Sequence, residues 1–258
     1  MRFHWAVLLI VIPVATLAIG NPSGLVVHEG VKEDLNGDGI EEMLIGIFYD
    51  SQAYFGFGSF GFDRFVLDIN GVHAATGSGV NLDAKVSVVD IDTTDTFREI
   101  AVPEAGPSSD DATQFFYFTG DSIVSVGKIP GKTPKYNGVG EVETNRRERI
   151  LHTWFYPARY RLNASHQLEF VEEKFYPMGH DVTVLNEFPL RVSPTDSDIA
   201  VVLHPGQKVT IVGGDDRRWC LVETETGAQG WFEVERYSFI VGADKRASEV
   251  FDGLRYAD

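Results

Sequence analysis

Short runs of apolar residues recur along the chain, separated by glycine, proline, aspartate and asparagine at intervals of about ten residues. The runs are rich in β-branched and aromatic side chains, which favour strands, and they are too short for helices. Beyond residue 20, no stretch shows the apolar period of an amphipathic helix. The pattern therefore predicts an all-β fold of antiparallel sheets. The clearest predicted strands are residues 65–69, 85–91, 99–102, 114–118 and 122–127.

The first twenty residues have the pattern of a signal peptide. Arg2 precedes an apolar run over residues 6–17, and small residues follow at Ala18 and Gly20, where a signal peptidase would act. The run is shorter than the roughly 20 residues that a bilayer-spanning helix needs. An uncleaved membrane anchor is the alternative. The sequence therefore predicts cleavage near Asn21 and a secreted or periplasmic mature protein without an integral membrane segment.

Length and charge set the broad class of the protein. The chain has 258 residues, 43% of them hydrophobic, and a formal net charge of −16. This length favours two domains, and the apolar content is sufficient for packed cores. An acidic chain repels phosphate backbones, so nucleic acid is not an expected partner. Cys220 is the single cysteine, which excludes an internal disulfide, and its apolar neighbours predict a buried side chain.

The sequence DLNGDGIEE, residues 34–42, places oxygen-bearing groups at every second position, with glycines that allow a tight loop. Calcium takes six to eight oxygen ligands, and this loop offers about five before water. We therefore predict a structural calcium site, with a metal-free turn that caps backbone amides as the alternative. An EF-hand is excluded because Ile45 stands where that motif requires glutamate. The predicted ligands are Asp34, Asn36, Asp38, the carbonyl of Ile40, and Glu42.

The acidic loop has a weaker copy at residues 90–102, DIDTTDTFREIAV. The first version, DLNGDGIEEMLIG, resembles the calcium-loop signature of FG-GAP or VCBS-type β-propeller repeats. The resemblance implies a propeller-like antiparallel sheet domain, assigned to residues 21–179, although the chain is too short for a full propeller of that family. In the second loop threonines replace both glycines, so a hydrogen-bonded turn is expected there rather than a metal site. Its acidic residues are Asp90, Asp92, Asp95 and Glu99.

Four motifs mark the last third of the chain. They are LRVSPT (190–195), VLHPGQKVTIV (202–212), WCLVET (219–224) and GAQGWFEVERY (227–237). Together they resemble a bacterial SH3 domain, and the glycine–tryptophan pair after a turn in the last motif is the most specific element. We assign this domain to residues 180–243.

The SH3 resemblance implies a small β-barrel that recognises peptidoglycan peptide or another extended peptide. Its groove residues are expected to be Trp231, Phe232 and Tyr237. Trp219 begins a strand of apolar periodicity and is expected in the core. Residues 244–258 are expected to form a short, charged C-terminal tail.

No catalytic constellation is evident in the sequence. The serine-hydrolase elbow, the zinc-protease helix motif, the P-loop and the dinucleotide fingerprint do not occur. The seven histidines are scattered, none within four residues of another, and are interpreted as surface or turn residues. Aromatic residues alternate with small ones over residues 54–65, which fits either core packing or an exposed binding stripe.

These observations predict an exported, non-catalytic binding protein of the cell envelope, whose partner is a cell-wall peptide or an envelope protein. A second hypothesis is a periplasmic or surface scaffold in which both domains bind protein. A third is a cell-wall hydrolase with an unrecognised site, for which the abundance of acidic residues in this chain is not in itself evidence.

Overall fold

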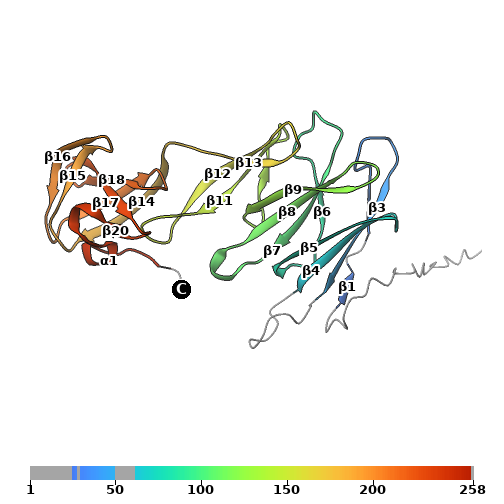
Figure 1. Cartoon of the computed structure of the whole chain (residues 1–258), viewed down its shortest axis with the longest axis horizontal. Coiled ribbons are helices and arrows are strands. Elements are labelled where there is room, and N and C mark those ends of the chain that lie inside the picture. The colour runs from blue at the N-terminus through green and yellow to red at the C-terminus, as the bar shows by residue number, and fades with distance from the viewer. Residues whose placement is uncertain (1–24, 28–29, 50–61, 257–258) are drawn as a thin grey trace, which may run out of the picture. The chain divides into compact units, whose positions relative to one another are not determined.

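The computed structural model describes residues 25–27, 30–49 and 62–256; the predicted signal peptide and most of the aromatic stretch 54–65 lie outside them. Regular structure in this part of the chain is almost entirely antiparallel strand (Figure 1), which confirms the all-β prediction. Within the same residues, no helix is both long and apolar enough to cross a membrane. The chain divides into two compact units. The first comprises Met1–Val89, Thr96–Ala105 and Phe115–Ser125, and the second Asp90–Asp95, Gly106–Gln114 and Val126–Asp258.

Among the described residues, nine strands form a first sheet in the order β1-β3-β4-β5-β7-β8-β9, with β2 paired to β3 and β6 to β7. Figure 1 shows β3, β4 and β5 side by side. The strands are β1 (Leu25–Val27), β2 (Val31–Glu33), β3 (Glu42–Tyr49), β4 (Phe62–Ile69), β5 (His73–Leu82), β6 (Ser87–Val89), β7 (Glu99–Glu104), β8 (Ala112–Phe118) and β9 (Ile123–Pro130), with a 3₁₀ turn η1 (Pro107–Ser109) before β8.

A three-residue turn joins β4 to β5. Ile69 pairs with His73, and between them Asn70 and Gly71 have φ angles of 57° and 70°. Asparagine and glycine adopt this left-handed backbone at the least steric cost, so the local sequence fixes the hairpin and its register.

The core beside the first sheet contains inward side chains of several strands together with Leu35 from the acidic loop. The ring centroids of Phe48 and Phe65 lie 6.1 Å apart, and Phe65 meets the ring of Phe116 edge to face at 5.8 Å. Leu35 is fully buried, and burying such a side chain stabilises the fold by about 1.5–3 kcal/mol. The acidic loop is therefore anchored to this core.

The second sheet has the order β10-β11-β12-β13. On β12 buried and exposed positions alternate, so Tyr156, Ala158 and Tyr160 share the inward face. Tyr156 packs on Tyr176 with ring centroids 4.2 Å apart. The strands are β10 (Lys135–Tyr136), β11 (Glu141–Arg147), β12 (Phe155–Leu162) and β13 (Leu168–Val171).

The third sheet has the order β16-β15-β19-β18-β17-β14-β22, with β20 paired to β19 and β21. This path is open, and a closed SH3-like barrel stays a prediction. The strands are β14 (Tyr176–Val184), β15 (Phe188–Ser193), β16 (Asp196–Leu203), β17 (Lys208–Gly214), β18 (Trp219–Thr224), β19 (Gln229–Glu235), β20 (Phe239–Ile240), β21 (Lys245–Arg246) and β22 (Phe251–Asp252), with the short helices η2 (Val241–Ala243) and α1 (Ala247–Val250).

Residues from the predicted C-terminal tail take part in the core of the third sheet. Ala247, Val250 and Phe251 are buried there, and the ring of Phe251 lies 5.6 Å from Phe188 and 5.7 Å from Phe232. The predicted domain border between residues 179 and 180 falls inside β14. The domain assignment itself stays a prediction.

Candidate functional site

The acidic loop is closed by hydrogen bonds between its side chains and its own backbone. Oδ1 of Asp34 accepts from the amide of Gly37 at 2.8 Å, and Oδ2 accepts from Gly39 at 2.9 Å. Oδ1 of Asp38 accepts from the Ile40 amide at 2.8 Å, and Oδ2 from the side-chain amide of Asn36 at 3.1 Å. Each carboxylate oxygen of these two aspartates therefore has a donor within the loop.

The fifth predicted ligand serves a different purpose in this structure. Glu42 is buried, and its Oε2 accepts from the amide of Leu35 at 2.8 Å, so it ties the loop to β3. Among the described residues, no group of three histidine, cysteine, aspartate or glutamate side chains is arranged to hold a metal. This geometry fits the metal-free turn better than the five-oxygen ligand set. Calcium binding stays a prediction for experiment.

The second acidic loop contains the hydrogen-bonded turn expected from its threonines. Oδ1 of Asp92 accepts from the amide and the hydroxyl of Thr94 at 3.0 and 2.7 Å. These bonds stabilise the carboxylate, with the hydroxyl contributing most, and so lower the pKa of Asp92 below its usual range. Nearby, Oδ1 of Asp90 is buried without a hydrogen-bond partner in the described part of the chain.

The outward face of β18 and β19 carries two tryptophans. Trp231 pairs directly with Leu221, and Trp219 lies two residues before Leu221 on the same strand, so all three point to one face. Both tryptophans are partly exposed, whereas Cys220 and Val222 between them are buried. The prediction that Cys220 is buried is confirmed. The prediction that Trp219 is a core residue is wrong, because neighbouring residues of a strand face opposite sides.

An arginine from the adjacent strand covers part of this face. Arg191 on β15 pairs with Trp231, and its guanidinium carbon lies 5.3 Å from the ring centroid of Trp219. The same guanidinium is 3.8 Å from the buried carboxylate of Glu233. A cation over an indole ring contributes about 0.5–1 kcal/mol at an exposed site. We call Trp219, Leu221, Trp231 and Arg191 the tryptophan face.

The other two predicted groove residues lie elsewhere. Phe232 is 2% exposed and packs edge to face against Phe188 in the core, so no ring face is accessible to a ligand. Tyr237 follows β19, is 41% exposed, and donates its hydroxyl hydrogen to Oε1 of Glu148 at 3.0 Å. Burial, followed by this carboxylate, raises the pKa of Tyr237 to about 12.

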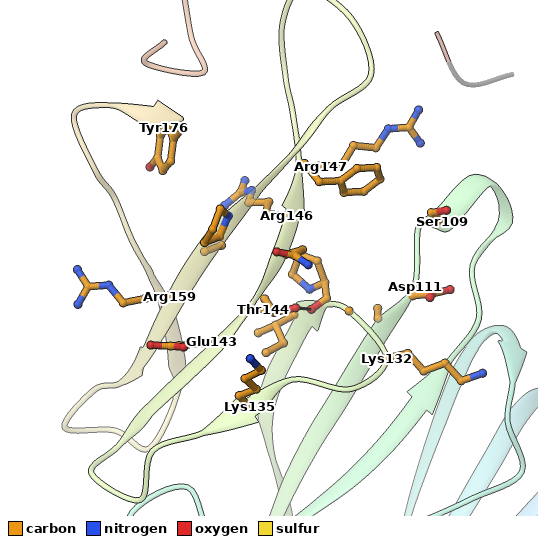
Figure 2. Close-up of a pocket in the computed structure, with 18 of the residues that line it drawn as sticks. Ser109, Asp111, Lys132, Lys135, Glu143, Thr144, Arg146, Arg147, Arg159 and Tyr176 are labelled. Carbon is orange, nitrogen blue, oxygen red and sulfur yellow. Dashed lines mark hydrogen bonds between the residues drawn. The ribbon is translucent and has the colours of Figure 1, made fainter. Parts of the chain in front are cut away.

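A ring contact links the tryptophan face to a charged groove of about 1260 Å³. Phe175 connects the charged groove to the tryptophan face. It lines the groove, and its ring meets that of Trp231 edge to face with centroids 6.2 Å apart. The groove is bounded by residues 109–112, 128–135 and 171–177 and by side chains of β11 and β12. Figure 2 shows Arg159, Glu143 and Tyr176 on one side of it and Ser109, Asp111 and Lys132 on the other.

Positive side chains outnumber negative ones in the charged groove, although the whole chain is strongly acidic. Arg159 pairs with Glu173 at 2.5 Å, Arg147 with Asp110 at 2.9 Å, and Arg146 lies over the ring of Phe170. The cationic residues are Lys128, Lys132, Lys135, Arg146, Arg147 and Arg159; the acidic ones are Asp110, Asp111, Glu143 and Glu173. Such a groove can pair with ligands that carry both carboxylate and amino groups.

Comparison with known proteins assigns no family, since no protein-family model matches the chain and no curated protein matches its sequence. The FG-GAP and SH3 resemblances therefore stay predictions. Sequence reasoning missed the charged groove because its side chains come from separate segments and form no motif. The only local signal is the presence of five arginines in residues 146–161, some of which the pairing of β11 with β12 brings to the groove.

Proposed function

We propose that this protein is an exported, non-catalytic binding protein of the cell envelope that recognises an extended peptide, with the stem peptide of peptidoglycan as the ligand class. The contact between Phe175, which lines the charged groove, and Trp231 of the tryptophan face carries the proposal. Trp231 and Phe175 link an apolar aromatic surface to a set of fixed charges. This combination suits a short peptide that carries both apolar methyl groups and charged groups.

Each part of the surface has its own task in this proposal. The indole rings of Trp219 and Trp231 pack against the peptide chain and contribute area at a low cost in side-chain entropy. Lys135 and Arg159 pair with the ligand's carboxylates, and Glu143 pairs with an ammonium group. A stem peptide carries both kinds of charge. The SH3 resemblance supports the same ligand class, and the N-terminal pattern supports the compartment.

The test is retention of the whole chain on purified peptidoglycan. We expect saturable binding that soluble stem peptide competes away, and a loss of about tenfold or more in affinity for Trp231→Ala, as for a central aromatic contact. Tyr256→Ala is the matched control, because Tyr256 is also an exposed aromatic residue but lies outside the charged groove. Absence of retention, or equal retention of wild type and Trp231→Ala, contradicts the proposal.

A scaffold that binds other envelope proteins is the second candidate, and strand β16 favours it. β16 ends the strand order of the third sheet, and Ile199 on it is 61% exposed. An exposed edge strand with an apolar side chain can accept a strand from a partner. In this case Ile199→Lys, and not Trp231→Ala, would abolish crosslinking of the purified chain to its envelope partner. Peptidoglycan retention would be absent in both.

A further inference from the structure

Two histidines and a methionine meet in the second compact unit, away from the tryptophan face and the charged groove. His152 lies between β11 and β12 and is 1% exposed. Met178 and His180 are on β14 and partly buried. Nε2 of His152 is 3.2 Å from Sδ of Met178, and the two imidazole centroids are 4.6 Å apart. Three side chains that can ligate a metal thus share one small volume.

Hydrogen bonds to carbonyls fix which nitrogens are protonated. Nδ1 of His152 is 3.1 Å from the carbonyl oxygen of Thr153, and Nε2 of His180 is 2.8 Å from that of Gly253. A carbonyl oxygen only accepts, so these nitrogens donate. In neutral rings this leaves Nε2 of His152 and Nδ1 of His180 with free lone pairs. A ring nitrogen that donates to a backbone carbonyl while the other is free is the usual arrangement of a metal-ligating histidine.

The contact between His152 and Met178 adds a sulfur atom to the pair of imidazole rings. With Nδ1 protonated, the lone pair of Nε2 faces a sulfur atom that also presents lone pairs, at 3.2 Å. The other neutral tautomer would instead turn a bare Nδ1 toward the Thr153 carbonyl. The doubly protonated ring is disfavoured because it would bury a charge. A bound cation between nitrogen and sulfur removes this conflict.

The backbone of β14 is irregular between Met178 and His180. The pairing of β14 with β17 slips between Pro177 and His180, which makes a β-bulge, and Gly179 within it has a φ of +63°. Bulges redirect side chains and occur often beside functional sites. Here the bulge lies between Met178 and His180, and both side chains reach His152.

We propose that His152, Met178 and His180 form a binding site for a soft monovalent cation of the copper(I) class. Thioether and imidazole are ligands that copper(I) accepts, whereas calcium and magnesium take oxygen. Metal–nitrogen bonds of about 2 Å place two ligating nitrogens up to about 4 Å apart, which the spacing of the rings allows. This site is independent of the proposed peptide-binding function.

The test is anaerobic titration of the whole chain with copper(I) in competition with a chromogenic chelator. We expect one equivalent bound, and at least a tenfold weaker affinity for Met178→Leu and for His180→Gln. Met178→Leu is close in volume, so it keeps the packing and removes only the sulfur. Two controls should bind as wild type does: His204→Gln, an exposed histidine that pairs with Glu187, and Cys220→Ala, which removes the only thiol.

A spectroscopic readout separates ligation from a general effect on folding. The extended fine structure of the copper X-ray absorption spectrum should show a sulfur scatterer in the wild type. In Met178→Leu it should show only nitrogen or oxygen. Melting temperatures without copper should be equal for the two proteins. Unchanged copper affinity in Met178→Leu, or tighter binding of zinc(II) than of copper(I) by the wild type, overturns the assignment.

Discussion

The hydroxyl of Tyr156 donates a hydrogen bond to Oδ2 of Asp216 at 2.8 Å, and Asp216 is 3% exposed. Oδ1 of the same carboxylate accepts from the amide of Arg149 at 2.7 Å. One buried side chain in the turn between β17 and β18 thus satisfies donors from β12 and from the segment before it. Burial raises the pKa of Asp216, and these two donors oppose that shift. The carboxylate holds the second and third sheets together.

Asp216→Ala should therefore be strongly destabilising. It leaves the buried hydroxyl of Tyr156 unsatisfied, at a cost of about 1–3 kcal/mol, and it removes the acceptor of the partly buried Arg149 amide. It also places alanine at a φ of 54°. Asp216→Asn should cost less, because asparagine tolerates this backbone and keeps one acceptor. Urea denaturation followed by tryptophan fluorescence measures both. Equal stability of wild type and Asp216→Ala would show that the contact with Tyr156 is not formed in solution.

Mild acid should destabilise the protein through His152. Burial, and then the charge of His180, lower the pKa of His152 to about 4 in the folded state, against about 6.5 when unfolded. Between these values the unfolded chain binds the proton and the folded chain does not, so stability falls as the pH falls from 6.5 to 4. The loss approaches roughly 3 kcal/mol. Urea denaturation of metal-free protein between pH 7 and 4 checks this, and His152→Gln should remove most of that slope.

Calcium should raise the melting temperature if the acidic loop binds it, because a ligand that binds only the folded state stabilises it. The measurement compares melting in calcium with melting in chelator. Asp38→Ala should erase the difference, whereas Asp198→Ala, which removes an exposed aspartate of β16, should leave it unchanged. Equal melting curves for the wild type would assign residues 34–42 to the metal-free turn that their hydrogen bonds form.

Phe232 and Trp231 should behave in opposite ways, although they are neighbours in sequence. Phe232→Ala opens a cavity between Phe188 and Phe251 and should cost about 3–5 kcal/mol of stability. Trp231→Ala removes a partly exposed ring and should cost much less, while it weakens retention on peptidoglycan. Denaturation and retention measured on both variants decide the matter. A loss of stability as large in Trp231→Ala would assign the ring to the fold rather than to a ligand.

The strand pattern was predictable because alternation and turn residues are local properties. The predicted strands at 99–102 and 114–118 lie within β7 and β8, and Asn70-Gly71 marks its hairpin. The face that a strand buries is not always readable. Because Cys220 is buried, its neighbour Trp219 must face outward. Both residues are apolar, so the sequence does not show which of the two faces the core.

The contacts between distant segments were beyond sequence reasoning. His152 is 26 residues from Met178, and nothing in either local sequence indicates that they meet. Their approach depends on the bulge at Gly179 and on the packing of Tyr156 against Tyr176, which are properties of the folded chain. The charged groove has the same origin in the register of β11 and β12.

Strand β14 has a consequence for how this protein can be divided. Its first residue, Tyr176, packs in the aromatic cluster of the second sheet, and its last, Val184, lies in the core of the third. A fragment that starts at residue 180 would therefore begin in the middle of a shared strand, and one that stops at 243 would lack Phe251. The SH3-like segment cut at those borders is therefore not a complete structural unit. Fusion or transplantation experiments should include Tyr176 and Phe251.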